Sequence, residues 1–237
     1  MNLAVIPARS GSTRIKDKNV TDLCGKPLIA YPLQAARDSG LFDTIHVSTD
    51  SDRYAEIVRG LGFEVEFLRD PALAGNQVGM IDVLRWVVGA YAKRGRGFDD
   101  VCMIMATAPL IEAEDLKRGY ALFVEHERHV PVLAVAPFAA AIERGFRIGE
   151  SGVLDPMFPE KRALHSQDLT PAYHDAGAFF FIDAGRLMAD TVEVYNQMLP
   201  LVLPRHKAVD IDEPEDLETA EILFRGRAAL RESTEAV

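Results

Sequence analysis

Short apolar runs alternate four times with amphipathic segments within about the first 110 residues, and this alternation restricts the possible folds more than any other feature. The apolar runs cover residues 3–6, 44–50, 64–68 and 101–106, and the helical patterns between them end near residues 39, 60 and 93. Strands separated by helices pair in parallel through right-handed crossovers. The sequence therefore predicts an α/β fold in which helices flank a mostly parallel sheet.

The second half of the chain is less regular. We expect a helix over residues 112–127, strands over 131–136, 177–182 and 208–212, and a last helix from 214 to about 224. Residues 138–176 contain no long periodic segment, which is uncommon in a compact domain, so we interpret them as an arm, lid or dimer contact built partly of hairpins. One domain over residues 1–226 and a flexible polar tail over 227–237 are predicted.

A cationic loop follows the first predicted strand. It contains Arg9, Arg14, Lys16 and Lys18 against one acid, Asp17, and so carries a net charge of +3 in a chain whose formal net charge is -10. One interpretation is an ordinary solvated surface loop. Because the loop lies between a buried strand and a helix, where open α/β sheets bind ligands, we favour a phosphate-binding role.

Small residues in this loop support the same interpretation. Gly11 lies between Ser10 and Ser12, so backbone N–H groups could approach an anion without an intervening Cβ. The loop matches neither G-x-x-x-x-G-K-[ST] nor G-x-G-x-x-G, which disfavours an ATPase and a classical dinucleotide enzyme.

The overall charge and the cysteines restrict the possible partners. A sequence pI of about 5.1 argues against a general nucleic-acid binder, which would carry a broad basic face. The sequence has neither a signal-peptide pattern nor a long apolar run, so we expect no membrane partner and a cytoplasmic location. Cys24 and Cys102 lack metal-ligand spacing and are expected to be free thiols.

Asp210 and Asp212 occupy alternate positions, which would place both carboxylates on one side of a strand. Facing a phosphate loop, they could hold Mg²⁺, which typically takes one or two carboxylates together with substrate phosphates. Asp212 also fits a capping box with Glu215 at the start of the helix at Pro214, an alternative that leaves Asp210 unexplained.

Polar residues precede the apolar strand predicted over 177–182. Gln167, Tyr173, His174 and Asp175 offer donors and acceptors suited to sugar hydroxyls, and Gly177 permits close approach. Adjacent residues on an extended chain point to opposite faces, so ligand contact is favoured over a catalytic His174–Asp175 pair. We interpret His126 and His129 as a solvated helix end and residues 179–181 as core.

With these features in view, the chain resembles the acylneuraminate cytidylyltransferases, and within them the pseudaminic acid branch most closely. The resemblance extends over about residues 3–224. It rests on the following segments: Ile6-Pro-Ala-Arg9, Lys18-Asn19, Cys24-Gly-Lys-Pro27, Val47-Ser-Thr-Asp50, Ala106-Thr-Ala-Pro109, Ser166-Gln-Asp-Leu169, Tyr173-His-Asp-Ala-Gly177 and Asp210-Ile-Asp212. Each segment is weak alone, and together, in this order, they are specific to the family.

The resemblance implies a Rossmann-like nucleotide-diphospho-sugar transferase fold and a homodimer in which residues 138–176 cross between subunits. It implies that CTP and a nine-carbon 2-keto sugar acid give the CMP-sugar and pyrophosphate, with Mg²⁺ as cofactor. The alternatives are the same reaction on KDO, legionaminic or N-acetylneuraminic acid, and a nucleotide-binding protein that has lost catalysis.

Site roles follow from the same resemblance. Arg9, Ser12 and Lys18 match the positions that contact the triphosphate, and Asn19 matches a nucleotide contact. Asp210 and Asp212 match metal ligands, and Asp175 and Gly177 fall where the sugar approaches. The expected nucleotide-binding set is Ala8, Arg9, Ser10, Gly11, Ser12, Asn19 and Thr107, and the expected catalytic set is Arg9, Arg14, Lys18 and Asp212.

Two positions depart from the family pattern. Thr13 stands where a phosphate-binding lysine is common, and Arg14 could supply the missing charge, as in the related KDO enzymes. His165 stands where the pseudaminate branch would have an arginine. If that arginine contacts the sugar carboxylate, its role passes to Arg162, to a protonated His165, or to no residue.

Overall fold

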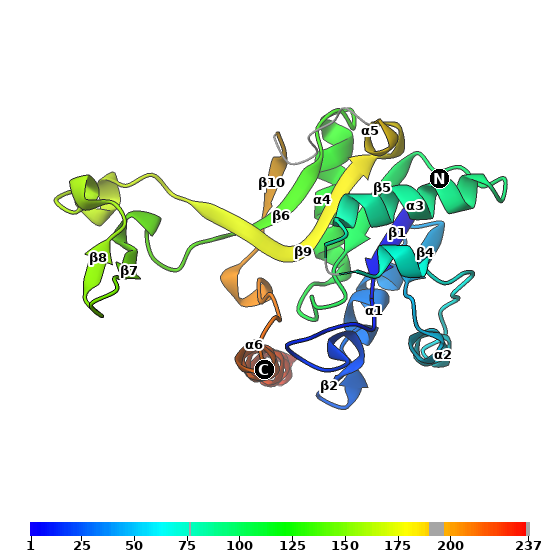
Figure 1. Ribbon diagram of the computed structural model, residues 1–237, viewed down its shortest axis with the longest axis horizontal. Helices are drawn as coiled ribbons and strands as arrows, with labels where there is room; N and C mark the ends of the chain where they lie inside the picture. The colour runs from blue at the N-terminus through cyan, green and yellow to red at the C-terminus, as the bar shows by residue number, and fades with distance from the viewer. Residues whose placement is uncertain (76, 190–196, 236–237) are drawn as a thin grey trace.

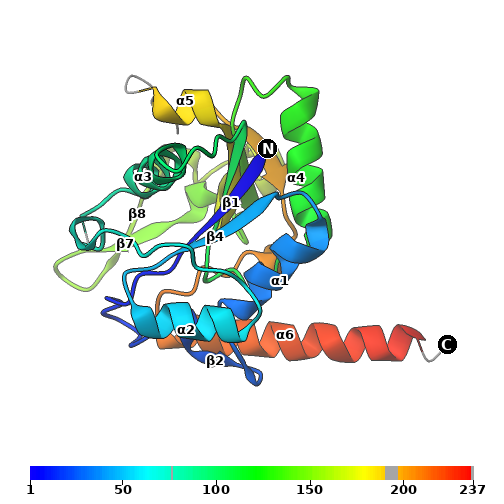
Figure 2. The same cartoon turned by 90° about the vertical axis from the view of Figure 1, so that its right-hand side faces the viewer.

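A six-stranded sheet forms the centre of the molecule, with the strand order β10-β6-β9-β5-β1-β4 (Figures 1 and 2). The computed structural model describes residues 1–75, 77–189 and 197–235. The sheet strands are β1 (Asn2–Pro7), β4 (Thr44–Ser48), β5 (Asp100–Ile104), β6 (Val132–Pro137), β9 (Tyr173–Asp183) and β10 (Leu199–Val202).

The pairing of these strands is mixed but mostly parallel. Strand β1 pairs in parallel with β4 and β5, and β10 pairs in parallel with β6. Strand β9 is antiparallel to both of its neighbours, β5 and β6. The predicted α/β class and parallel sheet are therefore confirmed, with β9 as the antiparallel member.

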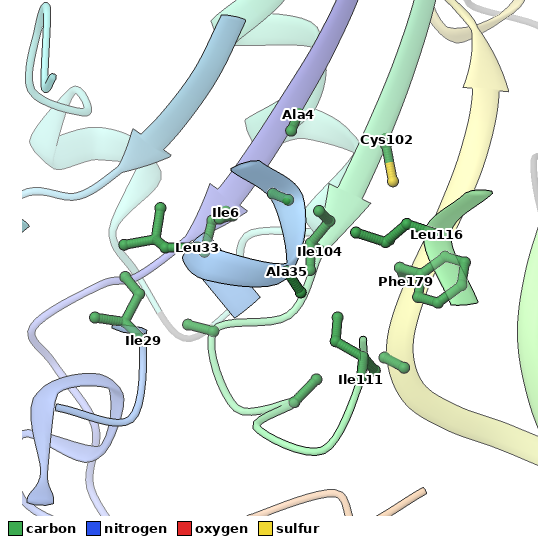
Figure 3. Close-up of a cluster of buried hydrophobic side chains, with 14 of the residues drawn as sticks. Ala4, Ile6, Ile29, Leu33, Ala35, Cys102, Ile104, Ile111, Leu116 and Phe179 are labelled. Atoms are coloured by element: carbon green, nitrogen blue, oxygen red, sulfur yellow. The ribbon is translucent and has the colours of Figure 1, made fainter. Parts of the chain in front are cut away.

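Helices cover both faces of this sheet. The helices are α1 (Ala30–Ser39), α2 (Asp52–Gly60), α3 (Met80–Ala92), α4 (Ala113–Glu125), α5 (Ala184–Met188) and α6 (Pro214–Glu235), of which α6 packs in a separate cluster with Leu23 and Leu28 rather than on the sheet. Alternate residues of β1 enter different cores: Ala4 and Ile6 pack with α1 and α4 (Figure 3), whereas Leu3 and Val5 pack with α3 and α5. This burial on both faces explains the continuous apolar run of β1.

Short elements complete the fold. A hairpin of β2 (Asp22–Leu23) and β3 (Lys26–Pro27) precedes α1 and turns at Cys24 and Gly25, which have positive φ angles of 51° and 86°. The 3-10 helices are η1 (Lys18–Val20), η2 (Pro71–Leu73), η3 (Ile142–Arg144), η4 (Pro159–Lys161), η5 (Ser166–Asp168) and η6 (Arg205–Lys207).

Two predicted strands are wrong. Residues 64–68 and 208–212 join no sheet in the described structure. In the first segment, Val65 belongs to the core on the α1 side, while Phe67 packs against the core on the α3 side and stacks on His46 of the edge strand β4. Its alternating apolar residues are thus buried without a strand partner.

An arm leaves the domain between β6 and β9 (Figure 1). It contains a hairpin of β7 (Phe146–Ile148) and β8 (Leu154–Pro156), as well as η3, η4 and η5. An arm built partly of a hairpin is therefore confirmed for the region after residue 138. Its role as a dimer contact stays a prediction.

Helix α6 continues to Glu235, so the predicted helix end near residue 224 is wrong, and the tail predicted from residue 227 begins within this helix. Arg227 fixes this extension, because its guanidinium donates to the carbonyl oxygen of Leu110 at 2.7 Å and pairs with Glu112 at 2.7 Å. Alanine, leucine and arginine residues after Gly226 also favour a helix. Residues 236–237 lie outside the described structure.

Candidate functional site: a cationic cavity at the end of β1

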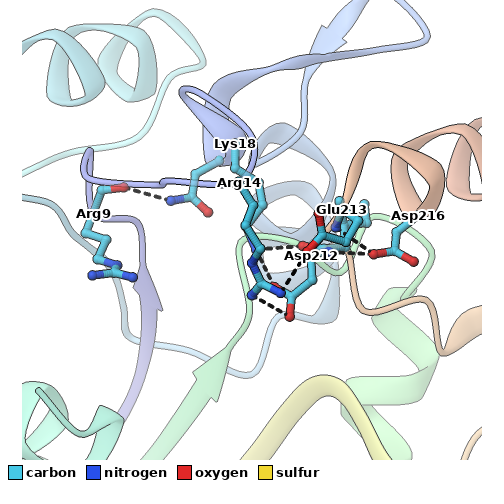
Figure 4. A network of polar contacts seen from close by, with 8 residues as sticks. Arg9, Arg14, Lys18, Asp212, Glu213 and Asp216 are labelled. Atoms are coloured by element: carbon cyan, nitrogen blue, oxygen red, sulfur yellow. Dashed lines mark hydrogen bonds and ion pairs between the residues drawn. The ribbon is translucent and has the colours of Figure 1, made fainter. Parts of the chain in front are cut away.

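The cationic loop lies at the carboxyl end of β1 and is held at both ends. The backbone N–H and hydroxyl of Ser10 donate to Asp50 at 2.8 and 2.9 Å. The amide of Asn19 donates to the carbonyl oxygen of Arg9 at 3.0 Å (Figure 4). Asp17 adopts a left-handed conformation with φ of 55° and accepts a hydrogen bond from Arg53, which lowers the pKa of this carboxyl group.

Residues of this loop line a cavity of about 170 Å³ together with the ends of distant elements. The lining residues are Pro7, Arg9, Ser12, Thr13, Arg14, Ile15, Lys18, Asn19, Arg69, Met80, Met105, Ala106, Thr107 and Asp212. The structure thus brings together most of the predicted nucleotide-binding and catalytic residues. Their individual roles stay predictions.

Some predicted nucleotide contacts do not face the cavity. Ala8 is fully buried, and its N–H donates to Ser48 of β4. Ser10 is engaged by Asp50, and a Cβ added to Gly11 would meet no atom within 4 Å. The protein's own packing therefore does not explain a glycine at position 11.

Asp212 is the carboxylate that faces the loop across the cavity. Lys18 Nζ lies 2.9 Å from its Oδ1, and Arg14 Nη2 lies 2.8 Å from its Oδ2 (Figure 4). Hydrogen bonding to Lys18, followed by that to Arg14, holds the pKa of Asp212 below its usual range. Lys18 also donates to the carbonyl oxygen of Ile211 at 2.6 Å. The loop is therefore hydrogen-bonded to the backbone of the segment before α6 as well as to the Asp212 side chain.

The alternative role of Asp212, a capping box with Glu215, is wrong. The carboxylate that closes the start of α6 belongs to Asp216, which accepts the backbone N–H groups of Asp212 at 2.9 Å and Glu213 at 2.7 Å. The side chain of Asp212 is therefore not used as a helix cap, and it faces the cavity instead.

Asp210 lies close to Gly177 of β9 rather than on a strand of its own. Gly177 has φ of 59°, and a Cβ added there would lie 2.8 Å from Cγ of Asp210, so a glycine is required for this approach. Although Asp210 is largely exposed as a residue, partial desolvation of its carboxylate raises its pKa. The nearby charge of Asp212 acts in the same direction.

These carboxylates suit a metal that takes part of its coordination from a substrate. Asp210 and Asp212 repel one another, so a cation between them would relieve the repulsion that raises the pKa of Asp210. Among the described residues, no group of three or more His, Cys, Asp or Glu side chains is arranged to hold a metal. Two carboxylates completed by phosphates and water are a common arrangement for Mg²⁺.

The predicted sugar-binding residues are spread along β9 and the arm. Asp175 lies near Asp210 and accepts from the N–H of Gly177 at 2.8 Å. The His174 ring contacts the carbonyl oxygen of Asp175 at 2.7 Å and packs against Phe138, so it forms no pair with the Asp175 carboxylate. Tyr173 is exposed at the base of the arm, where it is paired with Pro137.

Other predicted substrate residues lie on the arm itself. Gln167 is exposed in η5, and His165 precedes that helix. The Arg162 guanidinium stacks over Phe146 at 4.8 Å from the ring centroid. None of these side chains lines the cavity of its own chain.

Arg69 is a cavity residue that the sequence did not reveal. It is 3% exposed, and its guanidinium donates to the hydroxyl of Ser48 at 3.0 Å and to the Ser48 carbonyl oxygen at 2.7 Å. Burial, followed by the nearby charge of Arg9, lowers the pKa of Arg69, while Asp50 opposes the shift. A buried guanidinium beside a second arginine on one cavity favours an anionic ligand.

Comparison with known proteins gives a consistent result. A family model described as cytidylyltransferase matches residues 3–132. The pseudaminic acid cytidylyltransferase of Campylobacter jejuni (serotype O:2) is 36% identical over 225 residues, which cover 94% of this chain and 96% of the relative. The CMP-N,N'-diacetyllegionaminic acid synthase of Legionella pneumophila is 28% identical and covers 94% of this chain and 95% of its own length.

Solved structures show the same fold. A CMP:2-keto-3-deoxy-manno-octonic acid synthetase complexed with CTP matches with a TM-score of 0.71 at 15% identity, over 95% of this chain and 99% of that chain. A 4-diphosphocytidyl-2C-methyl-D-erythritol synthase matches with a TM-score of 0.66 at 17% identity, over 94% and 97% of the two chains. Among the described residues, no helix has the length and apolar character needed to cross a membrane.

Proposed function

Because the chain belongs to the cytidylyltransferase family, we propose that it transfers CMP from CTP to the anomeric hydroxyl of pseudaminic acid, a nine-carbon 2-keto sugar acid, and releases pyrophosphate. The observation that carries this proposal is the cavity lined by Arg9, Arg14, Lys18 and Arg69, in which Arg14 and Lys18 pair with the carboxylate of Asp212. The sugar assignment is supported by 36% identity to a pseudaminic acid enzyme, against 28% to a legionaminic acid enzyme.

The reaction is an in-line displacement at the α-phosphorus. The anomeric oxygen forms the new P–O bond, the bond to the bridging oxygen of the β-phosphate breaks, and pyrophosphate leaves with that electron pair. The anomeric proton passes to solvent or to a nearby base. Such transfers need mainly positioning and stabilisation of negative charge on the phosphate oxygens.

Basic side chains of the cavity would supply that stabilisation. Arg9, Arg14 and Lys18 neutralise the β- and γ-phosphates, and Asn19 fixes the loop by its bond to Arg9. Arg14 lies next to Thr13, where the family commonly has a lysine, and it already faces the cavity. Arg14 therefore replaces the charge that is missing at Thr13.

Mg²⁺ is the proposed cofactor, held by Asp210 and Asp212. When bound, it would neutralise charge on the α-phosphate. Gly177 would allow Asp210 to reach its position, and Asp175 lies close enough to influence Asp210 through its charge. Asp175 and Gly177 therefore border the region where the sugar acid would meet the α-phosphate.

A homodimer formed through the arm is the proposed assembly. The arm exposes apolar side chains that a soluble monomer would rarely leave uncovered, and these are Phe138, Ile142, Phe146, Ile148, Val153, Leu154, Met157 and Leu164. A second copy that covers them would also bring Arg162 and His165 against another subunit. The cytoplasmic location stays a prediction.

A panel of sugar acids with CTP and Mg²⁺ tests the proposal, with pyrophosphate release as the readout. Pseudaminic, legionaminic, N-acetylneuraminic and 2-keto-3-deoxy-manno-octonic acids are compared at equal concentrations. We expect the highest kcat/KM with pseudaminic acid. A higher value with another acid would transfer the assignment to that sugar, and CTP binding without turnover on any of them would favour a binding protein.

A further inference from the structure

Lys207 forms the most enclosed ion-pair cluster outside the cavity among the described residues. Its Nζ donates to Oε2 of Glu112 and to Oδ2 of Asp115, at 2.6 Å each. The side chain of Lys207 is 11% exposed and that of Asp115 is 3% exposed, so these charges are largely removed from water. Ion pairs with this burial and these distances fix geometry far better than surface pairs do.

The two acids in this cluster also begin helix α4. Glu112 and Asp115 form a capping box, in which the Asp115 carboxylate accepts the backbone N–H of Glu112 at 2.9 Å. The other carboxylate oxygen of Glu112 pairs with Arg227 of α6 at 2.7 Å. Lys207 therefore connects the segment before α6 to the start of α4.

This connection joins two walls of the cavity. The chain between β5 and α4 supplies Thr107 to one wall, and the segment after η6 supplies Asp212 to another. Lys207 is the last residue of η6 and directly precedes that second segment, three residues before Asp210. Because residues 208–212 join no sheet, no ladder of backbone hydrogen bonds sets their distance from Thr107.

We propose that Lys207 is a positioning residue, which holds Asp210 and Asp212 at the distance from the Thr107 wall that a divalent cation and a nucleoside triphosphate require. The inference rests on the proposed function, because it assumes that these carboxylates bind the cation. Lys207 does not line the cavity and touches no reacting atom. It acts through the backbone that it anchors.

The first measurement is Mn²⁺ binding by electron paramagnetic resonance, in the presence of saturating CTP and without sugar acid. In Lys207→Met we expect Mn²⁺ affinity to fall about tenfold, as is typical when supporting groups around a metal site are removed. Binding of CTP without metal should change less than twofold, because Arg9, Lys18 and Arg69 remain. Lys207→Arg keeps the cation and should restore most of the Mn²⁺ affinity.

Two further variants separate positioning from folding. Arg225→Met removes a cation from the exposed Arg225–Glu221 pair on α6 and should leave Mn²⁺ affinity unchanged. Lys207→Met leaves Asp115 buried without its main partner and should lower Tm, whereas Lys207→Met/Asp115→Asn removes that uncompensated charge and should recover Tm. The double variant should still bind Mn²⁺ about tenfold more weakly than the wild type.

Each outcome decides between the possibilities. Unchanged Mn²⁺ affinity in a folded Lys207→Met protein, or recovery of Mn²⁺ affinity together with Tm in the double variant, would overturn the positioning role. Wild-type protein that binds CTP but no Mn²⁺ would overturn the metal assignment, and this inference with it. Turnover of the sugar-acid panel tests the transferase proposal separately.

Discussion

Lys18 Nζ lies 2.9 Å from Oδ1 of Asp212, although 194 positions separate the two residues in the sequence. Through this contact, the loop after the first strand meets the segment before the last helix. Arg14 reaches the other oxygen of the same carboxylate at 2.8 Å. The cations and the acid of the proposed site are thus mutually oriented by the fold.

Loss of Lys18 should abolish most transfer without unfolding the protein. Lys18→Met removes a cation from the cavity, and we expect kcat to fall on the order of 10²- to 10³-fold, as for other groups that stabilise developing charge. Turnover with CTP and pseudaminic acid measures the effect. Lys16→Met is the matched control, since Lys16 does not line the cavity. Near-normal turnover in Lys18→Met would contradict the site assignment.

Asp212→Asn should be inactive for a different reason. The substitution keeps the size of the side chain but removes the charge that faces Lys18, Arg14 and the proposed cation. We expect a loss of about 10²-fold or more in kcat and a raised Mg²⁺ requirement. Glu213→Gln serves as the control, because Glu213 also pairs with Arg14 but does not line the cavity. Equal losses of kcat in the two variants would show that the total negative charge near Arg14 matters, and not the Asp212 carboxylate in particular.

Gly177→Ala tests the approach of Asp210 to β9. The new Cβ would lie 2.8 Å from Asp210 Cγ. The alanine would also have to adopt the left-handed φ of 59° that glycine has here. Backbone strain of this kind costs about 1–2 kcal/mol in stability. Gly40→Ala carries the same strain at φ of 64° with no atom within 4 Å of the new Cβ.

The two glycine variants should therefore differ in activity and not in the strain of the backbone. We expect turnover to fall sharply only in Gly177→Ala, where Asp210 must move. Comparable kcat values in both variants, at comparable Tm, would argue against a role for the position of Asp210.

His46 should make the protein less stable below neutral pH. Burial, with a smaller contribution from Arg69 and Arg94, lowers the pKa of His46 to about 3. The unfolded chain, with an ordinary histidine pKa of about 6.5, binds a proton more readily than the folded protein between these values. Stability is therefore lost as the pH falls below about 6.5, by about 1.4 kcal/mol at pH 5.5.

Urea denaturation at pH 7.5 and 5.5 measures this effect. His46→Gln removes the titrating ring and should reduce the loss between the two pH values by about that amount, even though the variant is less stable at both. Acids such as Asp17, whose pKa is lowered by Arg53, change the stability at lower pH and not between pH 7.5 and 5.5. If His46→Gln loses as much stability between pH 7.5 and 5.5 as the wild type does, His46 is not the group responsible.

Introducing charged residues into the arm should dissociate the proposed dimer into monomers. Ile148 and Leu154 are cross-strand neighbours in the β7–β8 hairpin and are 77% and 56% exposed. We expect light scattering after size exclusion to show a wild-type dimer and a monomer for Ile148→Asp/Leu154→Asp. Ile222→Asp, on the exposed side of α6, should remain a dimer. A monomeric wild type would contradict the proposed assembly.

The parallel part of the fold could be predicted because its signal is local. Strands β1, β4 and β5 are short apolar runs, and each pairs with a neighbour that follows a helical crossover. The segment 64–68 shows the limit of that signal. The alternating apolar residues of this segment are explained by their packing against the core, and such packing does not require pairing with another strand.

The site could be predicted in part for the same reason. The loop charges stand together in the sequence, so the phosphate-binding hypothesis needed no structure. Arg69 precedes an Asp-Pro turn and looks like an ordinary loop residue, and only its burial beside Arg9 reveals it. The link between Asp210 and Gly177 depends on a contact between distant segments, which no local pattern contains.

The position of β9 has a consequence for how the chain is made. This strand lies between β5 and β6 and is hydrogen-bonded to both, yet it leaves the ribosome after the arm has been synthesised. Until then, β5 and β6 have no partner on the edges that β9 will cover, and exposed edges of this kind invite pairing with other chains. The nascent protein therefore depends on the arrival of residues 173–183 to cover these two edges, and β10 is added to β6 only afterwards.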